Sequence, residues 1–192
     1  MEHSMQTASL DTTDLTALIE DLNTLASDEQ RIALIENAVI DLSEFASYHH
    51  FGENSYGRNL IYSNEDFEVI LMCWRSGQQS VAHDHSNSLC VMKCIAGVLE
   101  EQRYVKKAVA GELTDIIVPT SLNALENHQA IAITDNEGLH SLQNNSSADA
   151  CTLHFYFPPI HQANKYDMNS GEKTVVTSKF TSEYGVKLNS QS

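Results

Sequence analysis

Two histidines separated by one residue, His83 and His85, form the pattern in this sequence that points most directly to chemistry. On a β-strand, side chains at positions i and i+2 point to the same face, so both imidazoles could reach one metal ion. Imidazole is a ligand that suits iron and zinc. Asp84 lies between them, would point to the opposite face, and is not expected to bind the metal. Taken alone, such a pair is more often two surface histidines than a metal site.

The composition excludes several classes of partner. The chain has 192 residues, with 11 Lys and Arg against 26 Asp and Glu, and its formal net charge is −15. Such a charge repels nucleic acid and anionic membranes, so neither is expected as a partner. No stretch resembles a secretion signal or a membrane span. The four cysteines form no C-x-x-C pair, and we expect free thiols in a cytoplasmic monomer.

The length predicts a single domain that spans residues 1–192. Within it we expect a disordered leader over residues 1–10 and a helical region over 11–47. The remainder, from 54 to 188, is expected to form a barrel followed by a C-terminal hairpin.

Two helices are predicted near the N-terminus. Apolar residues recur at helical spacing over 15–25 and again over 32–45. One of residues 11–13 could cap the first helix, and Ser27 with Gln30 forms a capping box for the second. Both helices are expected to pack on the barrel.

The rest of the chain follows the pattern of a mainly β protein. Short apolar or β-branched runs alternate with turn residues, a spacing that predicts an antiparallel sandwich or barrel. A closing run over 174–176 could pair at an edge. The main predicted strands are 59–63, 67–75, 89–96, 98–105, 113–118, 129–134 and 151–157.

The histidine pair belongs to a longer pattern, G-x5-H-x-H-x4-C-x6-G, which begins at Gly77 and ends at Gly97. This pattern resembles the first motif of the cupin superfamily, with Cys90 where most cupins place a metal-binding Glu. The second cupin motif supplies a third histidine followed by Asn, and His140 with Asn144 matches it. The resemblance therefore implies a cupin-type, jelly-roll-like antiparallel barrel with a three-histidine metal site. Zinc could occupy the same nitrogens as iron.

Over residues 54–188 the sequence more specifically resembles the thiol dioxygenases of the cysteine dioxygenase type I family. Several separate motifs carry this resemblance in the same order along the chain. They are Tyr56-Gly57-Arg58-Asn59-Leu60, Cys73-Trp74, His83-Asp84-His85-Ser86-Asn87-Ser88 with Cys90 and Lys93, Gly138-Leu139-His140, and Thr152-Leu153-His154-Phe155-Tyr156 before Pro158-Pro159.

The resemblance implies a role for each matched residue. His83, His85 and His140 match the family's iron ligands, so the implied cofactor is one Fe(II) per chain. Arg58 matches the residue that pairs with the substrate carboxylate, a role that a guanidinium group performs well. Tyr56 matches a residue beside the same carboxylate.

Further matches concern the surroundings of the metal. Cys90 and Tyr156 match a pair that forms a thioether crosslink in animal-type members, although Cys90 could instead be a buried small hydrophobe. Thr152, His154 and Tyr156 share one strand face and match a hydrogen-bonded relay, in which Ser is usual at the position of Thr152. Trp74 is expected to form a wall of the pocket.

One departure concerns the pocket mouth. Animal members often carry a further cysteine shortly after the two prolines, where this chain has Ala163. The change leaves the implied metal and carboxylate sites untouched.

The implied reaction adds both atoms of O2 to L-cysteine and gives cysteine sulfinic acid, with the thiolate and amine bound to the iron. The nearest alternative is a 3-mercaptopropionate dioxygenase, which typically has Gln in place of Arg58 and Gly in place of Cys90. A non-catalytic metal-binding cupin, such as a sensor, would have no reason to keep Arg58, His154 and Tyr156 together. No nucleophile elbow, dinucleotide-binding motif or phosphate-binding loop occurs in the sequence.

Overall fold

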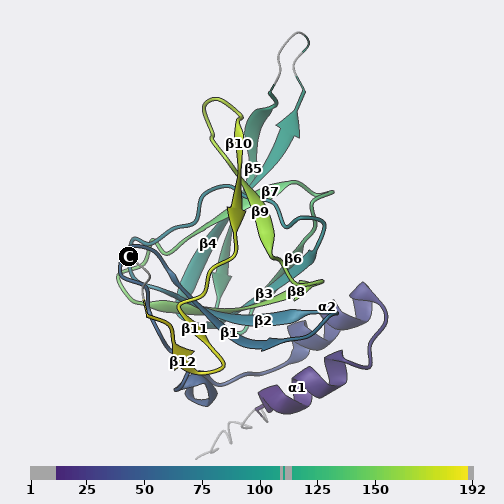
Figure 1. Ribbon diagram of the computed structural model, residues 1–192, viewed down its shortest axis with the longest axis vertical. Coiled ribbons are helices and arrows are strands. Elements are labelled where there is room, and N and C mark those ends of the chain that lie inside the picture. Colours follow the sequence, from purple (N-terminus) through teal and green to yellow (C-terminus); the bar gives the residue numbers. More distant parts are fainter. Residues whose placement is uncertain (1–11, 109, 111–113, 190–192) are drawn as a thin grey trace, which may run out of the picture.

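Two short helices pack against one face of a β-sheet in the computed structural model, which describes residues 12–108, 110 and 114–189 (Figure 1). The disordered leader expected over 1–10 lies outside the described residues. No helix in the described part of the chain is both long and apolar enough to cross a membrane. The helical elements are α1 (Leu15–Leu22), α2 (Asp28–Asn37) and the 3-10 helix η1 (Leu42–Phe45).

The helix starts follow capping chemistry. Asp14 caps α1, where its Oδ1 accepts a hydrogen bond from the Thr16 amide at 2.7 Å, so the cap expected within 11–13 was placed too early. The cap predicted at Ser27 is confirmed, because its Oγ accepts from the Gln30 amide at 3.3 Å.

The second helix ends earlier than its apolar pattern predicts. From Ala38 the chain is extended, and the Val39 carbonyl accepts a hydrogen bond from the Thr13 amide at 2.6 Å. The later apolar residues of the pattern therefore enter the core from an extended segment and from η1.

Twelve strands account for most of the described chain beyond Tyr56. They are β1 (Gly57–Ser63), β2 (Glu68–Trp74), β3 (Leu89–Ala96), β4 (Val98–Lys107), β5 (Ile116–Glu126), β6 (Ala130–Ile133), β7 (Leu139–Gln143), β8 (Ala150–Phe157), β9 (Gln162–Tyr166), β10 (Lys173–Thr177), β11 (Ser182–Glu183) and β12 (Val186–Lys187).

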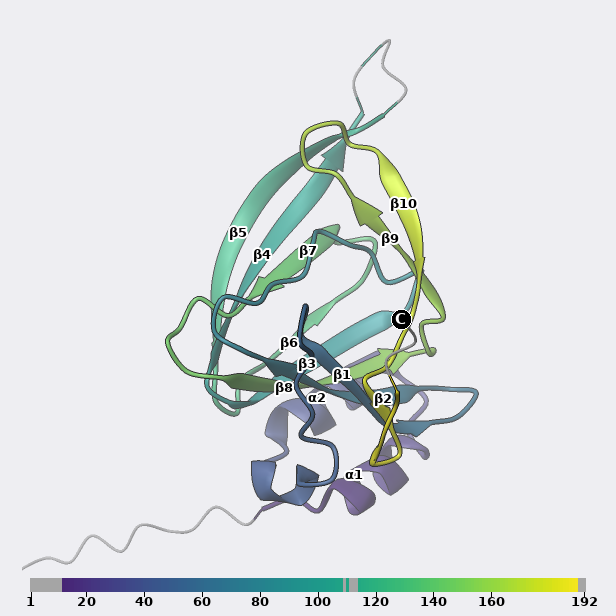
Figure 2. The same cartoon turned by 60° about the vertical axis from the view of Figure 1, so that its left-hand side comes forward.

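The strands form three sheets. The largest has the order β12-β11-β1-β2-β8-β3-β6, a second has the order β5-β4-β7, and β9 pairs with β10 as a hairpin. Figure 2 shows β4, β5 and β7 rising from the large sheet, with β9 and β10 on the other side of the interior. The mainly β, jelly-roll cupin fold with N-terminal helices is thus confirmed, although the three sheets do not close into one continuous barrel.

The centre of the large sheet is buried on both faces. Every residue of β2 and of β8 is buried, because helices cover one face and the other two sheets cover the opposite face. Alternation along β2 sends Leu71 and Cys73 to the helix side, where they pack with Phe45. Met72 and Trp74 point to the interior of the jelly roll. The candidate site lies on this interior side.

Candidate active site

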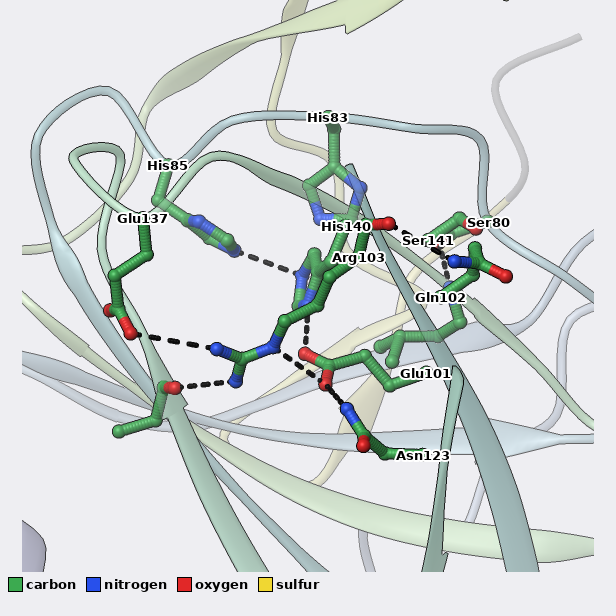
Figure 3. A network of polar contacts seen from close by, with 12 residues as sticks. Ser80, His83, His85, Glu101, Gln102, Arg103, Asn123, Glu137, His140 and Ser141 are labelled. Carbon is green, nitrogen blue, oxygen red and sulfur yellow. Dashed lines mark hydrogen bonds and ion pairs between the residues drawn. The ribbon is translucent and has the colours of Figure 1, made fainter. Parts of the chain in front are cut away.

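The three predicted metal-binding histidines come together at one point of the interior (Figure 3). One ring nitrogen from each of His83, His85 and His140 lies within 4.8 Å of the others. The two Nε2 atoms of His85 and His140 are 3.1 Å apart. His83 and His85 lie in the segment between β2 and β3, whereas His140 lies on β7.

Backbone pairing places the third histidine beside the first. His83 and His140 form an antiparallel bridge, in which each amide donates to the other's carbonyl, at 3.0 and 3.2 Å. Gly138, two residues before His140, lets the chain approach β4 closely, because its φ is +127° and a Cβ there would clash with the backbone oxygen of Tyr104 on β4.

A tight turn fixes the direction of His85. Ser86 and Asn87 both have positive φ, at 52° and 67°, which is rare outside glycine. The carboxylate of Asp135 holds this turn by accepting the backbone amides of His85 and Asn87, each at 2.7 Å. Burial alone would raise the pKa of Asp135, but the His85 imidazole and these amides lower it to about 2. Asp135 therefore stays ionised.

Glu101 on β4 orients the ring of His140 from behind (Figure 3). Its Oε1 lies 3.0 Å from His140 Nδ1, while its Oε2 accepts from Arg103 Nε at 2.9 Å and from Asn123 Nδ2 at 3.1 Å. The Glu101 side chain is 0% exposed. Because the carboxylate only accepts, Nδ1 of His140 carries the hydrogen and Nε2 presents its lone pair to the histidine cluster.

Electrostatics keep two of the three imidazoles neutral. Burial lowers the pKa of His83 and of His140 well below the ordinary value, and the neighbouring histidine side chains lower each further. Neutral imidazoles are the form that binds metal. The donor set, three imidazole nitrogens with one ring fixed by a buried carboxylate, therefore fits a divalent transition metal ion.

A cavity of about 440 Å³ opens directly onto the histidines. His83, His85, Tyr56, Arg58 and Tyr156 line it. Ala163, which was expected at the pocket mouth, is also among its lining residues. Further lining side chains that no motif indicated come from β9, from β10 and from the segment after β10: Lys165, Val176, Thr177, Ser178, Lys179, Phe180 and Thr181.

Arg58 offers an unused donor inside this cavity. Its Nη2 donates to Ser178 Oγ at 3.0 Å, and its guanidinium carbon lies 5.8 Å from the centre of the Phe180 ring. Its Nε is buried and has no hydrogen-bond partner among the described residues. A buried, unpaired donor on a cation is costly unless a ligand completes it, and a carboxylate is the matching acceptor.

Neighbouring groups hold the charge on Arg58. Burial alone would lower its pKa, but the nearby Tyr156, Tyr56 and Glu68 raise the pKa overall. Two further cations, Lys165 and Lys179, line the same cavity. In a chain with a net charge of −15, this local positive field favours an anionic ligand.

Trp74 lies one layer behind the cavity rather than among its lining residues. Its ring stacks on Tyr56, with centroids 4.1 Å apart and an angle of 22°. Trp74 is 0% exposed and so supports Tyr56, which faces the cavity.

A hydrogen-bonded chain leads from Trp74 to the cavity. Trp74 Nε1 donates to Thr152 Oγ1 at 2.9 Å, Thr152 Oγ1 lies 2.9 Å from His154 Nε2, and His154 Nδ1 lies 3.2 Å from the Tyr156 hydroxyl. Thr152 accepts from the indole, which leaves its own hydrogen available to His154 Nε2. His154 then carries its hydrogen on Nδ1 and donates it to Tyr156.

In this hydrogen-bonded series, the Tyr156 oxygen accepts from His154, so its own hydrogen points away from His154. Tyr156 lines the cavity. Burial, followed by the nearby Arg58, lowers the pKa of His154 well below its ordinary value, so the imidazole is neutral. Burial, followed by Cys90, raises the pKa of Tyr156 well above its ordinary value. Tyr156 is therefore a neutral phenol that can donate a hydrogen bond into the cavity.

Cys90 faces Tyr156 across two paired strands. They are direct partners in the antiparallel register of β3 and β8, where opposite side chains lie side by side. Cys90 is fully buried, and burial raises the pKa of its thiol.

Comparison with known proteins decides the family. Residues 1–169 match the family model of cysteine dioxygenase type I. Human cysteine dioxygenase type 1 is 34% identical over 189 residues, which cover 95% of this chain and 93% of the human protein. The chain belongs to the cysteine dioxygenase type I family.

Other similar proteins extend the comparison. Zebrafish cysteine dioxygenase type 1 is 30% identical over 79% of this chain and 76% of the fish protein. Among solved structures, an uncharacterised Klebsiella pneumoniae protein with a double-stranded β-helix domain has a TM-score of 0.45 and 13% identity, over 81% of this chain and 98% of that one.

In this cysteine dioxygenase family member, the sequence motifs located the histidines, Arg58 and the relay, but not the groups that hold them. Glu101, Asp135 and Ser178 carry no motif, and each contacts a site residue that is far away in the sequence. A buried acid on a strand was the only available signal for Glu101. For Ser178, 120 residues from Arg58, no local signal existed.

Proposed function

We propose that this protein is an Fe(II)-dependent dioxygenase that converts L-cysteine and O2 to L-cysteine sulfinic acid. The observation that carries the proposal is the shared cavity, which brings the three-histidine cluster and the unpaired Nε of Arg58 together. Membership of the cysteine dioxygenase type I family supports the same reaction. Both oxygen atoms end on the substrate sulfur, so no external reductant is required.

His83, His85 and His140 would hold the metal ion. Fe(II) bound there would supply the redox chemistry that lets O2 react with a thiolate, and it would lower the pKa of that thiol. Glu101 keeps His140 in the tautomer that presents Nε2, and the turn held by Asp135 directs His85. These contacts preset the ligand directions before any ion arrives.

Arg58 would bind the substrate carboxylate. Arg58 lines the cavity with its guanidinium group held by Ser178, and its buried Nε has no partner among the described residues. Tyr56, which stacks on Trp74, lines the same cavity. Binding the carboxylate at a fixed point orients the thiol of a small amino acid. Arg58 would thus favour the reaction by positioning the substrate and would take no part in the bond changes.

Tyr156 would donate a hydrogen bond to the reacting groups. The relay from Trp74 through Thr152 and His154 supplies a hydrogen to the phenol oxygen, so the phenol hydrogen remains directed to the cavity. A neutral donor placed in a buried cavity stabilises developing negative charge without reorganisation.

We also propose a thioether bond between Cys90 and Tyr156. The step would join Cys90 Sγ to a ring carbon beside the phenol oxygen, with loss of the thiol hydrogen and one ring hydrogen to O2 as the oxidant. Their direct pairing across β3 and β8 supports it. Intact and peptide mass spectrometry after aerobic turnover with iron should show a chain two hydrogens lighter. Cys90→Ala should not show this loss.

Labelled oxygen tests the proposed reaction directly. The iron-loaded protein, given L-cysteine under ¹⁸O2, should form sulfinate that carries two labelled oxygen atoms. Sulfinate with label in one oxygen only, or disulfide as the main product, would contradict a dioxygenase.

A further inference from the structure

A second cluster of metal-ligating side chains lies on the opposite face of the large sheet from the histidine triad. One ligand atom from each of His49, Cys73 and Cys151 lies within 4.8 Å of the others. Cys73 and Cys151 are direct partners across β2 and β8, and both pack on the helix side of the sheet. Trp74, the next residue along β2, points to the jelly-roll interior. The cluster is therefore separate from the catalytic cavity.

The distances in the cluster are those of a thiolate and imidazole metal site. The two Sγ atoms are 4.0 Å apart, and Cys151 Sγ lies 3.3 Å from His49 Nε2. A tetrahedral zinc ion with Zn–S bonds of about 2.3 Å and a Zn–N bond of about 2.0 Å needs S···S near 3.8 Å and S···N near 3.5 Å. Shifts of a few tenths of an ångström would bring these two distances to zinc-binding values, and Cys73 Sγ lies within 4.8 Å of the His49 ring nitrogen.

From this geometry we propose that His49, Cys73 and Cys151 bind one Zn²⁺ ion, with solvent as the fourth ligand. Sulfur and imidazole ligands suit zinc, and two thiolates cancel the charge of a dication. Charge balance matters here because Cys73 is 0% and Cys151 2% exposed. His49 is exposed and marks the side from which the ion and water enter.

The surroundings favour the metal-bound form. Asn59 Nδ2 lies 3.6 Å from Cys73 Sγ and donates to it, as an outer partner of a thiolate ligand would. The exposed carboxylate of Asp149 adds a negative field at Cys73. The hydrogen bond from Cys151, followed by burial, raises the pKa of Cys73, so this thiol keeps its proton in the metal-free protein. Because zinc binds thiolates, binding of Zn²⁺ should release thiol protons.

Bound zinc would tie the chain that precedes β1 to the centre of the sheet. His49 lies between η1 and β1, in the segment that leads to Tyr56 and Arg58. Cys73 and Cys151 belong to the two most buried strands. The ion would thus anchor the segment that carries the proposed carboxylate-binding residues without entering their cavity.

Cobalt provides a probe specific to thiolate ligands. The full chain is first given one equivalent of Fe(II) under argon with a phosphine reductant, and Co²⁺ is then titrated into it. We expect a near-ultraviolet sulfur-to-cobalt charge-transfer band that saturates at one equivalent and disappears when Zn²⁺ is added. The proton release is measured in parallel with a pH indicator.

Matched variants assign the band to the cluster. Cys73→Ser and Cys151→Ser should lose it, and His49→Ala, an exposed position, should bind cobalt more weakly by about tenfold or more. Two control variants should keep the band.

Cys94→Ala removes a buried cysteine on the interior face, whose Sγ contacts the carbonyls of Ala96 and Gly97. His50→Ala removes the imidazole of the residue that follows His49.

The outcomes are separable from those of the dioxygenase reaction, because none of the three ligands lines the catalytic cavity. A band that persists in both serine variants would overturn the proposal. A wild-type protein without the band would also overturn it. This includes a protein in which the two cysteines form a disulfide, seen as a loss of two hydrogens that a phosphine restores, and which binds no metal when reduced.

Discussion

Arg58 illustrates how one residue can select the substrate at a site where the metal itself selects little. The three imidazoles would accept thiols of many kinds, whereas a buried cation with an unpaired Nε favours those with a carboxylate. Ser178 and Phe180 hold the guanidinium group from a segment that is remote in sequence. In the proposed reaction, selectivity would therefore depend on one side chain and on the residues that fix it.

Substitution of Arg58 tests this role. Arg58→Gln should lower kcat/KM for L-cysteine by about tenfold to a hundredfold, because a hydrogen bond to a charged group contributes about 1.5–3 kcal/mol. Steady-state sulfinate formation measures the effect. Arg75→Gln, an exposed arginine beside Phe51, is the matched control and should behave as wild type. An unchanged kcat/KM in Arg58→Gln would refute the carboxylate contact.

Glu101 controls the metal site through His140. Glu101→Gln should weaken Fe(II) binding by about tenfold to a hundredfold, because the neutral amide no longer enforces the Nδ1–H tautomer. Competition with a chromophoric chelator measures the affinity. Glu100→Gln, the neighbouring position on β4, whose carboxylate pairs with Asn145, is the control. Equal iron affinity in both variants would contradict a positioning role for Glu101.

At the residue scale, sequence reasoning succeeds where ligands are close together in the chain. His83 and His85 share a strand-like segment, so their spacing alone indicates a common face. Glu101 lies 39 residues from His140. Its function arises only when β4 pairs with β7, which places Arg103 opposite His140. Such contacts depend on register, which local patterns do not encode.

At the scale of elements, β8 combines a structural and a functional face. Leu153 and Phe155 pack toward the helices, while Thr152, His154 and Tyr156 point to the interior and form the relay. Successive side chains of a strand point to opposite faces, so β8 can pack against the helices with one face and form the relay with the other.

A change at Thr152 separates these two uses. Thr152→Val keeps the shape but removes the hydroxyl, so Trp74 Nε1 loses its acceptor and His154 loses its tautomer control. We expect a free energy of unfolding lower by about 1–3 kcal/mol and a reduced kcat. Urea unfolding and steady-state kinetics measure the two effects. Thr152→Ser should retain both properties, and a Thr152→Val enzyme with wild-type kcat would exclude the relay.

The prediction of elements was best for buried strands and poorest for polar ones. The runs at β2, β3 and β8 were predicted almost to the residue, because both of their faces are buried and most of their residues are apolar or β-branched. β7 and β9 were missed as strands, since their sequences, LHSLQ and QANKY, are short and polar. β5 extends to Glu126, well beyond the predicted 113–118, because it is largely exposed and pairs with β4 through its backbone.

At the scale of the whole molecule, buried histidines couple stability to pH. The pKa values of His83, His140 and His154 are below 6.5 in the folded chain, so the unfolded state binds more protons as the pH falls. Their contribution to stability is therefore present above about pH 6.5 and decreases below it. This dependence applies to the metal-free protein.

Urea unfolding of the metal-free protein at about pH 7.5, 6.5 and 5.5 measures this dependence. The free energy of unfolding should fall toward the lowest pH. His154→Gln should flatten the dependence, whereas His161→Gln, at an exposed position, should leave it unchanged. A stability that rises between about pH 6.5 and 5.5 would contradict neutral buried histidines.

At the scale of the whole molecule, three cations and one carboxylate, that of Asp84, line the cavity of an acidic chain. Arg58, Lys165 and Lys179 line one cavity in a chain with a net charge of −15. The fold class followed from the alternation of apolar runs and from the cupin-like spacing of Gly77, the histidines and Gly97. The shape of the cavity did not, because it is closed by the segment after β10, which no motif marks.

Oxygen consumption tests the central claim most directly. The Fe(II)-loaded protein is compared with L-cysteine and with 3-mercaptopropionate, while sulfinate is quantified in the same samples. We predict rapid uptake with L-cysteine, matched by an equal amount of cysteine sulfinate, and much slower uptake with 3-mercaptopropionate. A preference for 3-mercaptopropionate would contradict the substrate assignment, and no uptake with either thiol would contradict the proposed dioxygenase activity.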